Sequence, residues 1–333
     1  MTSAAIRPET IERLASAVFP SFAMLAGMQL DLFTPLKDSP LTAAQLAQAL
    51  GVRADKLQPL LYALVAAGLL TVEGELFSNT SEAGHFLVRG KPTYIGGRQE
   101  GFSRAWNAVL KTAETIRTGT PQAKFNVYGT SPQEAELYYQ RSSPITSRRA
   151  RDLVARYDFS ACRNLLDVGG GGGDLSIVFT EACPQLSATV VDLPAVTPIT
   201  QRLVDEAKAG HRVQVVSADV VKRPLRGSYD VAVLLHFIQL LSPDQARLAI
   251  NHVGQAVAPG GWMYILGWVT DNSRVTPLDM VGLNLNYLNA FEQGQAYTEQ
   301  EHRGWLAGAG FVEGFERGMV PDGGNVIRAR KLG

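Results

Sequence analysis

The first part of the chain has apolar residues at helical spacing, interrupted by turn residues. Residues 9–35 predict a helix with Thr10 as its cap, which Pro20 interrupts or restarts. Two further helices are predicted within 39–52 and 53–70, and 71–87 predicts a hairpin with Gly74 at its tip. A helix, a tight turn, a second helix and a two-stranded wing form the winged helix-turn-helix pattern.

The second helix of this motif distinguishes a DNA reader from a packing module. A reading helix presents Arg, Lys, Asn or Gln to base edges. Residues 53–70 instead carry Asp55, Lys56, Gln58 and Tyr62, and their second half is Ala, Leu and Val. This composition favours a packing or dimerisation module over a DNA-binding regulator.

From residue 163 the pattern changes to short apolar runs separated by helical segments. The runs are NLLDVGG, SATVVDLP, VQVVSADV, YDVAVLLHF and GGWMYILGWV. Such runs indicate parallel strands in a sheet that is covered on both faces. Residues 100–158 are helical and mixed. Their arginine-rich piece, RSSPITSRRARDLVARY, is typical of a solvated helix face. The alternative is that one of Arg98, Arg104 or Arg141 meets an anionic substrate.

Composition narrows the functional classes. The 333 residues are 46% hydrophobic and 19% charged with a formal net charge of zero, which favours two globular domains and argues against binding nucleic acid through phosphates. The only cysteines, Cys162 and Cys183, indicate a reducing compartment. We expect a cytoplasmic protein with no membrane contact, because no membrane-length apolar run or signal-peptide pattern occurs. No pair of histidines has metal-ligand spacing, so no metal site is expected.

The strongest chemical signal is NLLDVGGGGGDLSIVFTEACPQLSATVVDLP. A strand ends at Asp167, residues 169–173 form a glycine turn, a helix begins near Asp174, and the next strand ends at Asp192. Glycines let the backbone approach a ligand, and an acid at the second strand end is placed to bind ribose hydroxyls. The arrangement therefore predicts a nucleotide-like cofactor.

Two details favour S-adenosylmethionine over a nicotinamide cofactor. The glycines are compact and follow Asp167, which would repel a pyrophosphate but suits a cationic amino-acid end. Asp219 ends a third strand, where the amino group of adenine needs an acceptor. The alternative is that these acids are simple strand-end caps.

The chain resembles the plant and bacterial O-methyltransferase family nearly end to end, through LLDVGGGGG, VVDLPAV, SADVV, AVAPGGWMYI and YTEQEHRGWLAGAGF. The resemblance implies an α/β fold: a Rossmann-like S-adenosylmethionine methyltransferase domain preceded by an all-helical winged-helix dimerisation domain, in a homodimer. The expected boundaries are 1–100 for dimerisation, 101–158 for a helical connector that contributes to the substrate pocket, and 159–333 for the methyltransferase domain. The expected cofactor contacts are Asp167, Gly169, Gly170, Gly171, Asp192, Leu193, Asp219, Val220, Leu235 and His236.

The chain departs from this family at the catalytic group. Members that methylate phenols use a histidine base supported by two glutamates. Aligned through VLLHFIQLLSPDQARLAI, the base position falls on Gln239 and not on His236. The glutamate positions hold Gly267 or Trp268, and Ala296. All three catalytic groups of the family are therefore expected to be absent.

The missing base favours a sulfur acceptor. A phenol must lose a proton as it attacks the methyl group, and a positioned base speeds such a step by ~10²–10⁴. A thioether has no proton to lose, so alignment alone can serve. The family includes a bacterial branch that S-methylates 4-methylthio-2-hydroxybutyrate in dimethylsulfoniopropionate synthesis, and the resemblance implies that this chain is a candidate member.

The alternatives are an O-methyltransferase with a relocated base at Tyr138, Tyr139 or Tyr287, a C- or N-methyltransferase, and a non-catalytic relative. By analogy with the family, the small-molecule substrate is expected to contact Trp106, Tyr138, Tyr139, Arg141, Gln239, Asn286 and Tyr287.

Overall fold

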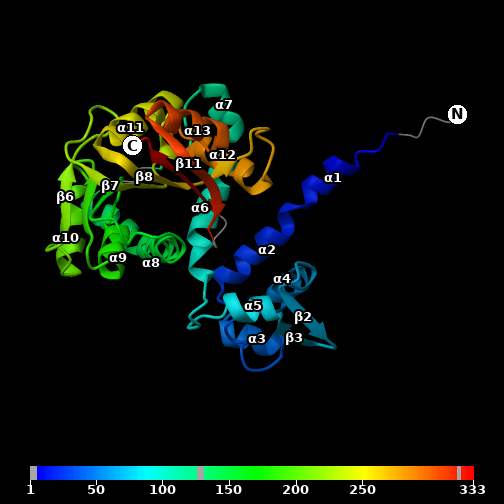
Figure 1. The fold of residues 1–333 in the computed structure, drawn as a ribbon. Helices are drawn as coiled ribbons and strands as arrows, with labels where there is room; N and C mark the ends of the chain where they lie inside the picture. The colour runs from blue at the N-terminus through cyan, green and yellow to red at the C-terminus, as the bar shows by residue number, and fades with distance from the viewer. Residues whose placement is uncertain (1–5, 126–130, 321–323) are drawn as a thin grey trace. The chain divides into compact units, whose positions relative to one another are not determined.

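A computed structural model describes residues 6–125, 131–320 and 324–333. The chain divides into two compact units, Met1–Asn107 and Ala108–Gly333 (Figure 1). Among the described residues, no helix is both long and apolar enough to cross a membrane.

Unit 1 is helical apart from its wing. Its elements are α1 (Glu9–Ser16), α2 (Val18–Gln29), β1 (Leu41–Thr42), α3 (Ala43–Leu50), α4 (Ala54–Ala66), β2 (Leu70–Glu73), β3 (Leu76–Asn79), α5 (Ser81–Phe86), η1 (Gly96–Arg98) and α6 (Gln99–Val109), which continues into unit 2. The strands pair in the order β1-β3-β2. Thr42 caps α3 in a capping box and Gly51 ends it in the left-handed conformation.

Three details of unit 1 differ from the prediction. The first helix breaks at Ala17 and not at Pro20, because Pro20 lies in the first turn of α2, where its missing N–H costs no hydrogen bond. Thr10 lies within α1, whose N-cap is Pro8. The hairpin ends at Asn79, since the side chain of Thr80 caps a further helix, α5.

Unit 2 is a seven-stranded sheet with helices on both faces. Its elements are α7 (Thr112–Thr118), α8 (Pro132–Arg156), β4 (Asn164–Val168), α9 (Asp174–Ala182), β5 (Ser187–Asp192), α10 (Thr197–Glu206), β6 (Val213–Ser217), β7 (Tyr229–Leu235), η2 (Ile238–Leu240), α11 (Pro243–Ala256), β8 (Val257–Gly267), β9 (Val269–Thr270), α12 (Leu278–Ala290), β10 (Tyr297–Thr298), α13 (Glu299–Gly308), β11 (Phe311–Met319) and β12 (Asn325–Lys331).

The strand order is β11-β12-β8-β7-β4-β5-β6. The five predicted strands, β4 to β8, are parallel, whereas β11 and β12 are antiparallel. The two antiparallel strands escape the sequence pattern because FVEGFERGM and NVIRARK contain charged residues and therefore lack the continuous apolar runs of β4 to β8. Since β4 lies between β5 and β7, the strand order reverses beside β4, where open α/β sheets bind ligands.

Alternate strand residues fill two cores. Leu165 and Val231 pack with helices α8 and α9, whereas Leu166 and Ala232 pack with α11 and α13 on the opposite face (Figure 1). Both faces of the sheet are therefore buried, as predicted. Polar groups gather at its carboxyl edge, where the strands end.

Candidate active site

The glycine turn after β4 brings bare backbone to this edge. Gly169, Gly171 and Gly173 have φ values of +67°, +54° and +81°, a region that glycine enters without strain. A Cβ on Gly170 would lie 2.6 Å from Val190 Cγ1 and 2.8 Å from the Asp167 carboxyl group. A Cβ on Gly171 would lie 2.7 Å from the ring of Tyr139. A larger residue at 171 is therefore excluded by both conformation and space, and one at 170 by space.

Asp192, at the end of β5, holds the turn in place. Its Oδ2 accepts the Gly171 N–H at 2.9 Å and its Oδ1 accepts the Leu193 N–H at 2.7 Å. Thr200 donates from Oγ1 to the Gly171 carbonyl at 2.5 Å. Burial raises the pKa of Asp192, and the two backbone donors oppose that shift.

Asp167, at the end of β4, is a buried carboxyl group that is only half satisfied. It is 1% exposed, and its Oδ2 accepts from Ser176 Oγ at 2.8 Å. Its Oδ1 has no hydrogen-bond partner among the described residues. Burial raises the pKa of Asp167 to about 7, and the charge of Asp192 adds to the shift. A cationic ligand group beside Oδ1 would supply the missing partner and favour the ionised form.

Asp219 lies just beyond β6 on the same edge. Its Oδ1 accepts the Val221 N–H at 3.0 Å, and its Oδ2 lies 3.1 Å from Lys222 Nζ. Val220 is buried, and its carbonyl meets His252 Nδ1 at 2.8 Å. We name Asp167, residues 169–173, Asp192 and Asp219 the cofactor edge. The orphaned Asp167 oxygen and the bare glycine backbone fit the cationic amino-acid end of S-adenosylmethionine.

Gln239 lies in η2, after the end of β7. It is 5% exposed, and its Nε2 lies 2.6 Å from His236 Nδ1. It also hydrogen-bonds the phenol of Tyr287. A Cβ on Gly267 would overlap Gln239 Oε1, so the amide occupies the space that a side chain at 267 would need. Ala296 is fully buried and brings no charge.

Two further groups adjoin this amide. The ring of Trp268 lies 5.6 Å from the ring of His236, and the guanidinium of Arg149 lies 5.6 Å from the Trp268 ring. Arg149 is 7% exposed on α8. Arg149, His236, Gln239, Trp268 and Tyr287 are named the Gln239 cluster. They come from α8, the end of β7, η2, the end of β8 and α12.

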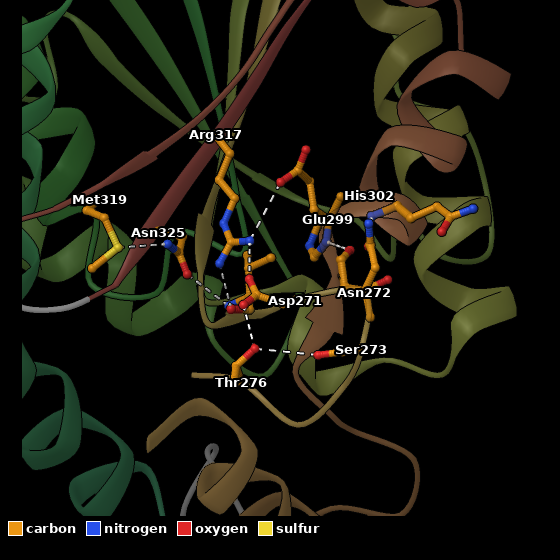
Figure 2. A network of polar contacts seen from close by, with 12 residues as sticks. Asp271, Asn272, Ser273, Thr276, Glu299, His302, Arg317, Met319 and Asn325 are labelled. Atoms are coloured by element: carbon orange, nitrogen blue, oxygen red, sulfur yellow. Dashed lines mark hydrogen bonds and ion pairs between the residues drawn. The ribbon is translucent and has the colours of Figure 1, made fainter. Parts of the chain in front are cut away.

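A polar network fixes the segment that leads from Trp268 to α12 (Figure 2). Arg317 of β11 lies 3.0 Å from Asp271 and 3.6 Å from Glu299. Thr276 donates to Asp271 at 2.6 Å, and the same segment is tied to α13 by Asn272, which accepts the Gln300 N–H at 3.0 Å. These contacts hold the start of the helix that carries Tyr287.

The expected substrate residues fall into separate places. Tyr139 is buried against the glycine turn and meets Tyr138 edge-on at 5.4 Å. Asn286 is half-buried and Arg141 is exposed. Trp106 belongs to unit 1, where it stacks on Phe102 at 5.9 Å.

Arg149 is not among the residues predicted for the site, and Trp268 was predicted only as a replacement for a glutamate. Arg149 lies four residues before Leu153, so the burial of Leu153 in the structure places it on the inward face of the helix. Among the described residues, no group of three or more His, Cys, Asp or Glu could hold a metal ion.

Comparisons with known proteins agree on one family. An O-methyltransferase domain model matches residues 107–312, and an O-methyltransferase dimerisation domain model matches 12–89. The 3-hydroxy-5-methyl-1-naphthoate 3-O-methyltransferase of Streptomyces sahachiroi is 30% identical, covering 92% of this chain and 90% of its own. The N,N-dimethyltransferase OxyT of Streptomyces rimosus is 27% identical, covering 93% and 94%. An O-methyltransferase family protein from Burkholderia thailandensis has the same fold, with a TM-score of 0.78, 23% identity and 99% coverage of both chains.

Proposed function

The chain belongs to the O-methyltransferase family and is an S-adenosylmethionine-dependent methyltransferase of small molecules, and we propose that it works without a general base at position 239. The observation that carries the proposal is the amide of Gln239, which hydrogen-bonds His236 and Tyr287. An amide accepts no proton at neutral pH. The neighbouring positions, Gly267 and Ala296, supply no carboxylate to support a base.

The cofactor supplies an electrophilic methyl group on a sulfonium. In our proposal, Asp192 binds the ribose hydroxyls, Asp219 lies toward the adenine and Asp167 faces the cationic amino-acid end. The orphaned oxygen of Asp167 supports the last of these roles. The dimerisation-domain match supports the proposal that two copies of the chain form a homodimer.

The acceptor that best suits a base-free site is a nucleophile with no proton to lose. We propose a thioether, with 4-methylthio-2-hydroxybutyrate of dimethylsulfoniopropionate synthesis as the first compound to test. A relocated base at Tyr287 is disfavoured, because burial raises the pKa of that phenol and keeps its proton in place. An amine is the second candidate, supported by the similarity to an N,N-dimethyltransferase.

The experiment is a turnover screen with purified protein and S-adenosylmethionine, read by mass spectrometry. Thioether, thiol, amine, phenol and enol acceptors are compared at equal concentration. We expect methylation of thioethers or amines and little product from phenols. Product from phenols alone, with a rate that rises steeply with pH, would show that a base operates after all.

A further inference from the structure

Three of the elements that carry the Gln239 cluster meet one short segment, residues 294–298, which we name the brace. The brace leads from α12 to α13 and contains β10, which pairs in parallel with β9. Its partner residues in β9, Val269 and Thr270, directly follow Trp268. The pairing therefore holds the chain beside the indole of the cluster.

The brace also packs against the backbone of η2. A Cβ on Gly294 would lie 2.6 Å from the backbone carbonyl oxygen of Gln239, so no side chain fits there unless the helical turn moves. The phenol of Tyr297 donates to the Leu241 carbonyl. Tyr297 is buried, and its ring meets Trp305 of α13 edge-on at 4.8 Å, which fixes this donor. The brace therefore sets the place of η2 by close packing and by one hydrogen bond.

The third contact of the brace is with α12. The N–H of Ala296, a fully buried residue, donates to Asn284 Oδ1 at 2.6 Å. Asn284 lies three residues before Tyr287 in the same helix, almost one turn away. The phenol of Tyr287 hydrogen-bonds Gln239. Both partners of this hydrogen bond are thus held by the same short segment.

We propose that the brace positions the acceptor side of the active site, with Asn284 and Tyr297 as positioning residues that act through Tyr287 and Gln239. Methyl transfer needs the acceptor in line with the methyl group, and a misplacement of about 1 Å can slow a reaction by ~10². This deepens the proposed function and rests on it, because the Gln239 cluster affects the rate only if the acceptor lies against it. The carboxylates and glycines of the cofactor edge follow β4, β5 and β6, so cofactor affinity should not depend on the brace.

The first experiment is NMR of the full-length protein labelled with [ζ-¹³C]tyrosine, in which Tyr287 is assigned by Tyr287→Phe. The Cζ resonance reports the hydrogen bond of a phenol. Asn284→Ala removes the acceptor of the Ala296 N–H, and Tyr297→Phe removes only the hydroxyl that donates to Leu241. Both should move the Tyr287 resonance, whereas Asn284→Asp keeps an accepting oxygen and should leave it near the wild-type position.

A purely structural role of these residues would lower the melting temperature and leave the Tyr287 resonance of the folded variants in place. That outcome would overturn the proposal. The wild type provides a test that needs no variant, because the Ala296 amide must be protected from hydrogen exchange. Rapid exchange of this amide would also overturn the proposal.

The second experiment separates the acceptor side from the cofactor side. Calorimetry should give the same affinity for S-adenosylhomocysteine in Asn284→Ala as in the wild type, and a weaker affinity would contradict the proposal. With saturating 4-methylthio-2-hydroxybutyrate and S-adenosylmethionine, kcat should fall roughly fivefold in Asn284→Ala and recover in Asn284→Asp. Asn251→Ala, at an exposed position of α11, is the matched control and should change neither quantity.

The two proposals fail in different ways. No turnover by the wild type would count against the proposed acceptor alone, and the NMR, exchange and affinity measurements would still decide the role of the brace. An unchanged kcat in Asn284→Ala, with turnover by the wild type, would contradict the brace and leave the proposed acceptor in place.

Discussion

The cofactor edge and the Gln239 cluster lie at the same edge of one sheet, yet they are built differently. The cofactor edge uses carboxylates and bare backbone from three short stretches, each at the end of a strand. The Gln239 cluster uses side chains from five separate elements. The first is set by local sequence and the second by tertiary packing. We therefore expect changes at the cofactor edge to weaken cofactor binding, and changes in the cluster to alter acceptor turnover only.

The largest effect is expected from Gly171→Ala. The new Cβ would combine a φ of +54° with a 2.7 Å approach to the buried ring of Tyr139, and would disturb the N–H that Asp192 holds. Left-handed strain of ~1–2 kcal/mol plus the lost hydrogen bond corresponds to roughly a hundredfold weaker binding of S-adenosylhomocysteine. Calorimetry measures this affinity.

Gly304→Ala on α13 is the matched control, because nothing lies within 4 Å of its Cβ position and alanine favours a helix. It should leave cofactor affinity unchanged. Equal affinities of the Gly171→Ala variant and the wild type would mean that the glycine turn does not bind the cofactor.

Gly267→Ala is the corresponding test of the cluster and should have a smaller effect. The added methyl would collide with the amide oxygen of Gln239, the mobile end of a side chain, so the fold should survive while the amide shifts. We expect roughly a tenfold loss of kcat/KM for the acceptor and unchanged affinity for S-adenosylhomocysteine. Steady-state kinetics and calorimetry separate the two quantities.

The double variant Gly267→Ala/Gln239→Ala makes the coupling visible. Without the amide there is no collision, so the methyl at 267 should cost almost nothing in the Gln239→Ala background. Gly282→Ala, on an open face of α12, is the control for a glycine change in the same unit. Additive losses in the double variant would argue against contact between the two positions.

The same difference between the cofactor edge and the Gln239 cluster explains how much of each region could be predicted from the sequence. Asp167, Asp192 and Asp219 each follow an apolar run, so one linear pattern predicts both the strand and the site. Arg149 stands among several arginines of α8, and only the packing of that helix selects it over the exposed Arg141. Likewise β11 and β12 lack the continuous apolar runs that mark β4 to β8, and their place in the sheet is set by pairing, of β12 with β8 and of β11 with β12.

A smaller effect is expected from pH, which should change cofactor affinity at the cofactor edge through the ionisation of Asp167. Burial raises the pKa of Asp167 to about 7, so between pH 6 and 8 the carboxyl group ionises and can pair with the cationic end of the cofactor. Affinity for S-adenosylhomocysteine should therefore rise several-fold over that range. In the unfolded chain this carboxyl group has an ordinary pKa. Between about pH 4 and 7 the folded protein therefore retains a proton that the unfolded chain has lost. The free energy of unfolding consequently falls as the pH rises through this range.

Asp167→Asn removes both effects. It should abolish the pH dependence of affinity, bind the ligand more weakly, and unfold at a higher temperature than the wild type at pH 8 but not at pH 5. Calorimetry and thermal melts measure these quantities, with the exposed Asp244→Asn as control. A pH-independent affinity in the wild type would remove Asp167 from the cofactor site.

The smallest expected effect is the most informative about the cluster. With both substrates saturating, cofactor binding no longer limits the rate, so kcat should change less than about twofold from pH 7 to 9. Gln239→Ala should lower kcat/KM by less than about tenfold, because it removes a positioning contact, whereas loss of a general base costs ~10²–10⁴. A loss beyond a hundredfold, or a kcat that rises tenfold per pH unit, would mean that a proton is removed in the rate-limiting step. The Gln239 cluster would then contain a general base, contrary to the proposed base-free mechanism.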